Sequence, residues 1–258
     1  MQLDEHFQRR LNEARMFFAE GKALAAEKIY RDLLKPDLPA GGRVLVLDGL
    51  GRCLHIQGRL EEAETFFRES LRFLEELFGP NHIHVAGGLQ NLARLRSERG
   101  ECEEAATLGE RALDILKQNL PADDLRIADA LLNLSSHQYT AKKYDAAEAN
   151  LKMALHLWEA KEGRRCFGVS TCLNNLGRIC EERGETRQGV LYHQEAVSIR
   201  KEILGIIRKR PSRSATAARR WPGMRSGRKP PIRLRKRSPA MTASGFPTAR
   251  RPLPAATT

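Results

Sequence analysis

The chain has 258 residues and a formal net charge of +12, and 41% of its residues are hydrophobic but only 6% are aromatic. No apolar run approaches the roughly 20 residues that a membrane-spanning helix needs, and the acidic, polar start lacks the features of a secretory signal. The five cysteines are odd in number and form no Cys-x-x-Cys pair, which favours reduced thiols. We therefore expect a cytoplasmic protein without a membrane span or a disulfide framework.

The dominant pattern is a repeat of forty-two residues, marked by pairs such as Leu50-Gly51. Small residues follow each pair at two fixed distances: Ala63, Ala105, Ala147 and Gly189, and then Ser70, Ala112, Ala154 and Ala196. Two helices approach to about 8–10 Å only where their contact points carry small side chains. This pattern is typical of stacked helical hairpins, each of which buries its apolar face against a neighbour.

Turn and stop residues divide the chain into five predicted hairpins between about residues 5 and 205. The first, less regular hairpin turns at Gly21, and Pro36, Pro39, Gly41 and Gly42 connect it to the second. The other four are predicted to turn at Gly58, Gly100, Lys142 and Gly184, and their second helices to end at Gly79, Pro121, Gly163 and Gly205. These residue types are common at helix ends because glycine accepts a positive φ and proline cannot continue a helix.

The repeat residues Leu50-Gly51, Leu54, Gly58, Ala63, Phe67 and Ser70 resemble the tetratricopeptide repeat consensus of alternating small and large apolar residues. The segment from Phe78 to Ala86, followed by Leu89, Asn91, Leu92 and Ala93, is similar to the inter-repeat signature of the kinesin light chain subtype. No unit has the consensus tryptophan, and Lys142 and Gly189 depart from the pattern. The resemblance implies an all-α, right-handed superhelical solenoid of about five antiparallel hairpins that binds a protein partner and is not an enzyme.

In repeats of this kind the first helix of each hairpin lines the concave wall, and polar residues recur there in two ladders. One ladder holds Asn12, Gly49, Asn91, Asn133 and Asn175, and the other, three residues later, holds Arg15, Arg52, Arg94, Ser136 and Arg178. An asparagine amide pairs with peptide backbone of any sequence, and the arginine guanidinium suits carboxylates. We predict that an extended, acid-containing peptide binds to the following eight residues: Asn12, Arg15, Arg52, Asn91, Arg94, Asn133, Asn175 and Arg178.

Bracing between repeats is the open alternative for both ladders. Asparagine at this place can bridge neighbouring helices, and the arginines can pair with intramolecular acids such as Glu13, Glu98 or Glu181.

The sequence contains no recognisable catalytic or cofactor signature. A phosphate-binding loop, a Gly-x-Ser-x-Gly elbow and a His-Glu-x-x-His helix are all absent. His82 and His84 lie two residues apart without a third ligand, so we assign them to the inter-repeat signature and not to a metal site. We expect neither a cofactor nor a metal.

Residues 206–258 differ in composition from the preceding residues. They hold fifteen Lys and Arg, no Asp or Glu and eight of the twelve prolines, which leaves 29 basic and 32 acidic residues in 1–205. Such a mixture buries too little apolar surface to fold, so we expect a repeat domain over 1–205 and a disordered basic tail over 206–258.

Three interpretations of this tail are open. Clusters such as Arg208-Lys209-Arg210 and Arg233-Leu234-Arg235-Lys236-Arg237 suit phosphates of nucleic acid or anionic lipid, which makes a nucleic-acid-associated regulator the alternative function. The tail can equally be a solvated extension without a specific partner, or the product of a shifted reading frame.

The last predicted helix carries apolar residues that no following hairpin covers. They are Val190, Leu191, Val197, Ile199, Ile203 and Leu204. We expect a partner, a second copy or residues lost from this reading frame to cover that face, and we predict self-association of the isolated chain.

Overall fold

The computed structural model describes the backbone of residues 5–209 and the side chains of residues 5–205, and this part contains ten α-helices and no strand. The helices are α1 (Glu5–Ala19), α2 (Ala23–Leu33), α3 (Ala40–Ile56), α4 (Leu60–Phe78), α5 (Ile83–Glu98), α6 (Cys102–Asn119), α7 (Leu125–Thr140), α8 (Tyr144–Glu162), α9 (Phe167–Glu182) and α10 (Thr186–Lys209). The predicted disorder of 206–258 concerns residues that, apart from the backbone of 206–209, lie outside this part.

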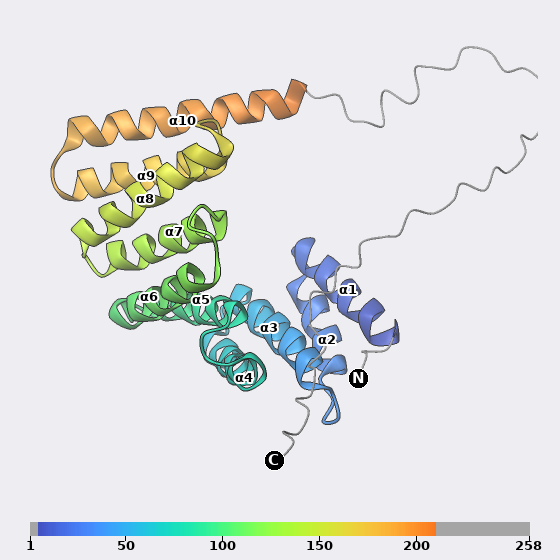
Figure 1. Ribbon diagram of the computed structural model, residues 1–258. Coiled ribbons are helices and arrows are strands. Elements are labelled where there is room, and N and C mark those ends of the chain that lie inside the picture. The colour runs from blue at the N-terminus through green and yellow to red at the C-terminus, as the bar shows by residue number, and fades with distance from the viewer. Residues whose placement is uncertain (1–4, 210–258) are drawn as a thin grey trace, which may run out of the picture. The chain divides into compact units, whose positions relative to one another are not determined.

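The helices pack in chain order as five antiparallel pairs, α1/α2, α3/α4, α5/α6, α7/α8 and α9/α10 (Figure 1). Each second helix also packs against the first helix of the next pair. Successive first helices touch directly in α1/α3, α5/α7 and α7/α9, whereas no two second helices of the described residues meet as extensively. The first helices therefore form the inner wall. The predicted all-α solenoid of five hairpins is confirmed.

Small residues occupy the contacts between helices, as the repeat predicts. Ala63, Ala105 and Ala147 are completely buried. A Cβ atom added at Gly51 would lie 2.6 Å from the Phe67 ring, so only glycine fits at this crossing. The small positions of the repeat thus set how closely the helices approach.

The predicted turns are confirmed at the hairpin tips. Lys142 adopts a φ of +59°, the conformation that glycine adopts at the other four tips. Helix α6 ends before Pro121 because a residue that precedes proline is pushed out of the helical region, and Leu120 is extended.

Gly205 was predicted to end the last helix, and this prediction is wrong because α10 continues to Lys209. Glycine permits a helix end without imposing one, and Gly205 does not take a positive φ.

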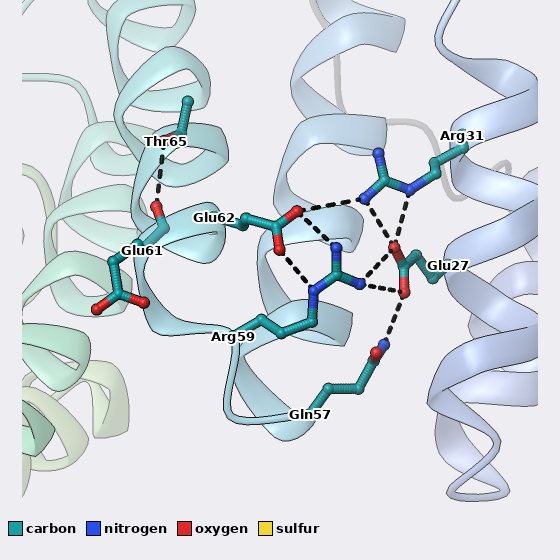
Figure 2. A network of polar contacts seen from close by, with 7 residues as sticks. All are labelled: Glu27, Arg31, Gln57, Arg59, Glu61, Glu62 and Thr65. Carbon is teal, nitrogen blue, oxygen red and sulfur yellow. Dashed lines mark hydrogen bonds and ion pairs between the residues drawn. The ribbon is translucent and has the colours of Figure 1, made fainter.

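A buried carboxylate joins the first hairpin to the second. Glu27 on α2 is only 7% exposed and accepts hydrogen bonds from Gln57 Nε2 at 2.8 Å, Arg31 Nε at 2.8 Å and Arg59 Nη1 at 3.1 Å (Figure 2). Burial acts to raise the pKa of Glu27, but the hydrogen bonds from Gln57 and Arg31 and the two arginine charges outweigh it and lower the pKa. The carboxylate is therefore held in its charged form.

The same contact recurs along the solenoid. Glu64 on α4 pairs with Arg99 after α5, and Glu148 on α8 pairs with Arg183 after α9 at 2.6 Å. In the remaining junction the corresponding residues are Ala106 and Ala141, so both partners are absent together. We refer to Glu27, Glu64 and Glu148 as the bracing carboxylates.

Candidate peptide-binding surface

All eight predicted binding residues lie on first helices, along the inner wall of the solenoid. They are Asn12 and Arg15 on α1, Arg52 on α3, Asn91 and Arg94 on α5, Asn133 on α7, and Asn175 and Arg178 on α9. Asn91 and Asn175 are half-buried, and the other six are exposed. A side-chain ladder on consecutive first helices is thus present and largely open to solvent.

Three of the arginines surround a carboxylate that the sequence analysis did not single out. Asn91 Nδ2 donates a hydrogen bond of 2.7 Å to Oδ1 of the half-buried Asp48 on α3. Burial raises the pKa of Asp48, while the positive charges of Arg52, Arg94 and Arg15 act in the opposite direction. The structure therefore brings Arg15, Arg52, Asn91 and Arg94, from three successive first helices, around Asp48. We call these five residues the Asp48 cluster.

Two ladder arginines rest on aromatic rings. The guanidinium carbon of Arg52 lies 4.7 Å from the ring centroid of Phe18, and that of Arg178 lies 4.2 Å from the ring centroid of Tyr139. Stacking on a ring orients the planar fork while leaving its edge available for a carboxylate. Arg178 on α9 makes its contact with α7, so the structure does not bring it into the Asp48 cluster.

The acids named in the bracing alternative have other partners. Glu13 pairs with Arg10 at 2.8 Å, Glu98 with His55 at 2.7 Å and Glu181 with His193 at 3.3 Å. Among the ladder asparagines of the described residues, Asn91 alone forms a hydrogen bond to another side chain. That bond does bridge α3 and α5, so Asn91 has a bracing contact in addition to its place in the wall.

The sequence carries a local signal for Asp48. It is the one polar residue in the run from Val44 to Leu50, and it directly precedes Gly49, the ladder position without an asparagine. A Cβ atom at Gly49 would lie 2.4 Å from the Tyr30 ring, which explains why no asparagine stands there.

His82 has a structural contact at the start of α5. Its Nδ1 accepts a hydrogen bond of 3.3 Å from the backbone N–H of His84, and its ring stacks on Phe78 with centroids 4.7 Å apart. This contact caps the helix within the inter-repeat segment. Within residues 5–209 we find no group of three or more His, Cys, Asp or Glu that could hold a metal ion.

A family model described as the tetratricopeptide repeat matches residues 43–118 and 126–202. The chain belongs to the tetratricopeptide repeat family. The match covers the second to fifth hairpins, and the first hairpin, α1/α2, lies outside it.

Relatives among curated proteins are distant and much longer. The chain is 23% identical over 155 residues to a clustered mitochondria protein homolog of Emericella nidulans. The aligned region covers 60% of this chain and 13% of that protein. It is 27% identical over 136 residues to a TPR repeat-containing protein of Dictyostelium discoideum, with coverage of 52% and 8%. The chain thus spans only a small part of these relatives.

Solved structures confirm the kinesin light chain-like resemblance at the level of the fold. A putative kinesin light chain from Podospora anserina with nearly identical TPR-like repeats has a TM-score of 0.64 at 15% identity, covering 79% of this chain and 99% of that chain. BtubC (BKLC) from P. vanneervenii has a TM-score of 0.63 at 20% identity, with coverage of 86% and 84%. MamA has a TM-score of 0.53 at 18% identity, with coverage of 80% and 99%.

The lengths and compositions of the described helices can be compared with those of membrane-spanning helices. Within the described residues, no helix combines the length and the apolar composition that crossing a bilayer requires.

Proposed function

We propose that this tetratricopeptide repeat protein is a non-enzymatic, cytoplasmic scaffold whose inner wall binds an extended, acid-containing peptide. The observation that carries the proposal is the Asp48 cluster, in which the positive charges of three arginines from α1, α3 and α5 act on a single carboxylate that accepts a hydrogen bond from Asn91. Three positive charges against one negative charge leave a surplus of positive charge on the wall. A peptide carboxylate compensates this surplus better than a neutral or basic segment does.

The asparagines supply the part of recognition that is independent of peptide sequence. The Asn91 amide nitrogen donates to Asp48, which leaves its carbonyl oxygen to accept a hydrogen bond from a peptide N–H. In the same ladder Asn12 and Asn133 are exposed and Asn175 is half-buried. An extended peptide can pair with successive asparagines while its acidic side chains meet Arg15, Arg52, Arg94 and Arg178.

Nucleic-acid binding through residues 206–258 is the second candidate function. The observation in its favour is the tail's fifteen Lys and Arg without a single Asp or Glu. A tail of this charge gives binding that weakens steeply with salt. Deletion of 206–258 separates the two functions, because a scaffold keeps its peptide ligand and a tail-dependent regulator loses salt-sensitive binding to a duplex DNA probe.

Peptide selection on the full chain, followed by titration of a selected peptide, tests the proposed scaffold function. We expect Arg94→Ala/Asn133→Ala to weaken binding in fluorescence anisotropy by at least about tenfold, since two charge-assisted or backbone contacts are lost. The melting temperature should change little. Unchanged peptide binding together with a sharp loss of thermal stability would instead assign the ladders to bracing.

A further inference from the structure

Helix α10 exposes an apolar row at the end of the solenoid. Val190, Val197 and Leu204 are spaced seven residues apart and are 45%, 48% and 53% exposed. Gln194 and Lys201 lie between them on the same exposed face. We call these five residues the α10 face.

Two of the predicted uncovered residues belong to the opposite side of α10. Ile199 is 5% exposed and packs with Val169 and Leu173 of α9, and Ile203 packs against the same cluster. The prediction that these two lack a cover is wrong, because the helical period turns them toward the preceding helix. Val190, Leu191, Val197 and Leu204 remain exposed, and three of them, Val190, Val197 and Leu204, form a regular row.

The inner repeats bury or partly bury the residues that correspond to the centre of the α10 face. The residues that correspond to Val197 are Leu71, Leu113 and Leu155. Leu71 packs toward Gly88 of α5, Leu113 is 5% exposed, and Leu155 packs against the cluster that contains Val169. In α4, α6 and α8 this position is thus buried or packed against the following hairpin, whereas no helix of the described residues follows α10.

The α10 face also lacks the bracing carboxylate. Val190 stands at the position of Glu27, Glu64 and Glu148. A further hairpin of the same kind, with an arginine after its first helix, would meet a valine there. The valine extends the apolar row of Val190, Val197 and Leu204 within this face, and the row suits a partner surface that is itself apolar.

The other end of the solenoid does not match this face. The outward side of α1 is mostly polar, with Glu5, Gln8, Arg9, Asn12, Glu13 and, just after the helix, Glu20, and it also carries the exposed Met16 and the half-buried Phe17 near the end of the helix. The residues of α3 that correspond to the first five of these, and that lie against α2, are Gly42, Leu45, Val46, Gly49 and Leu50. A chain of copies joined from α10 to α1 would therefore set an apolar row against a side that is polar apart from Met16 and Phe17.

The spacing of the α10 face fits a second copy of itself. In an antiparallel pair centred on Val197, Val190 of one copy packs against Leu204 of the second copy, because both lie seven residues from the centre. Lys201 then lies beside Gln194 of the second copy, whose side-chain carbonyl oxygen can accept a hydrogen bond from the Lys201 ammonium group. A parallel pair would place the two Lys201 ammonium groups at the same level, where they repel.

We propose that two copies of the chain associate through their α10 faces in an antiparallel, two-fold symmetric pair with Val197 on the axis. Such an isologous contact closes on itself and gives a dimer, not a filament. It leaves the inner wall of each copy available, since the ladder residues lie on first helices.

Cysteine cross-linking of the full chain tests both the partner and the register. In a Cys102→Ser/Cys166→Ser background, Val197→Cys should form a disulfide dimer on mild oxidation. Val190→Cys and Leu204→Cys should form one only when the two variants are mixed. Met153→Cys on α8, which is 49% exposed but outside the α10 face, serves as the matched control and should stay uncross-linked.

Light scattering supplies an independent readout. We expect a concentration-dependent dimer for the wild type and for Met153→Asp, and a monomer for Val197→Asp. A wild-type monomer at all concentrations would overturn the proposal. So would a Val197→Asp variant that stays dimeric, or cross-linking that joins Val197→Cys no faster than the control.

Discussion

Ionisation of Asp48 opposes folding, since burial raises the pKa of this carboxyl group in the folded chain. Because the pKa of Asp48 is higher in the folded chain than in the unfolded chain, the folded chain is favoured while Asp48 is protonated. This contribution to the free energy of unfolding is full at low pH and is lost as the pH rises through the folded-state pKa. Asp48→Asn keeps the neutral form at every pH and still accepts the hydrogen bond from Asn91. We expect its melting temperature to exceed that of the wild type by about 2–4 °C at pH 7, roughly 1 kcal/mol for a domain of this size.

The difference in melting temperature between Asp48→Asn and wild type should shrink as the pH falls and Asp48 becomes protonated in both the folded and the unfolded chain. Differential scanning fluorimetry at a series of pH values measures the effect, with the exposed Asp114→Asn on α6 as the control. A variant that melts below wild type at pH 7 would mean that the arginines need the Asp48 charge more than burial disfavours it.

The five cysteines should differ strongly in reactivity. Burial raises the pKa of Cys53 to about 11 and that of Cys172 to about 12, and it also raises the pKa of Cys180. Cys102 and Cys166 are less buried. Because the thiolate is the reactive form, iodoacetamide at pH 7.5 should label Cys102 and Cys166 at least about tenfold faster than the other three.

Peptide mass spectrometry after timed quenching measures these labelling rates, and guanidinium should equalise them. Equally fast labelling of Cys53 or Cys172 in the native protein would contradict the packing of α3 or α9.

At the scale of the helical elements, the turn at Lys142 is the weakest hairpin tip. A non-glycine residue with a φ of +59° is disfavoured by about 1–2 kcal/mol, part of which glycine offsets through its larger unfolded-state entropy. We expect Lys142→Gly to raise the free energy of unfolding by about 0.5–1 kcal/mol in urea titration. The reverse change, Gly100→Lys, should lower it by a similar amount. Destabilisation by Lys142→Gly would show that the lysine side chain supports the turn.

The junction between the first two hairpins depends on the charge of Glu27. Its pKa is lowered despite burial, so the carboxylate contributes stability that is present above the unfolded pKa and is lost as the pH falls through the folded pKa. Glu27→Gln should lower the free energy of unfolding by about 1–3 kcal/mol at pH 7, because Arg31 and Arg59 lose their charged acceptor.

The stability lost in Glu27→Gln should diminish as the pH falls. Glu61→Gln, at an exposed residue that Figure 2 also labels, should have little effect at any pH. Equal effects of the two substitutions would contradict the bracing role of Glu27.

At the scale of the whole molecule, the fold follows from the sequence because one spacing rule governs the second to fifth hairpins. Ala63, Ala105 and Ala147 recur at the same place and are all buried, so a single sequence is enough to predict the stacking. The end of α10 was not predictable in this way, since Gly205 permits both a stop and a continuation.

The site was predictable only in part. Periodicity identified the ladder residues, because each repeat presents the same face to the inner wall. Periodicity could not identify Asp48, because this aspartate occurs in one repeat only. Its electrostatic environment is set by arginines on α1, α3 and α5, which the repeat pattern does not link to it. The bracing carboxylates do recur, but their partners lie in the next hairpin, 30 or more residues away in the sequence.

The central claim is that surplus positive charge on the inner wall selects acidic peptides. Peptide display on wild type, on Arg52→Glu/Arg94→Glu and on the second-helix control Arg72→Glu measures it as the net charge of the selected sequences. We predict acid-enriched peptides for wild type and for the control, and a shift to neutral or basic peptides for the inner-wall variant. The same charge distribution for all three proteins would contradict the account.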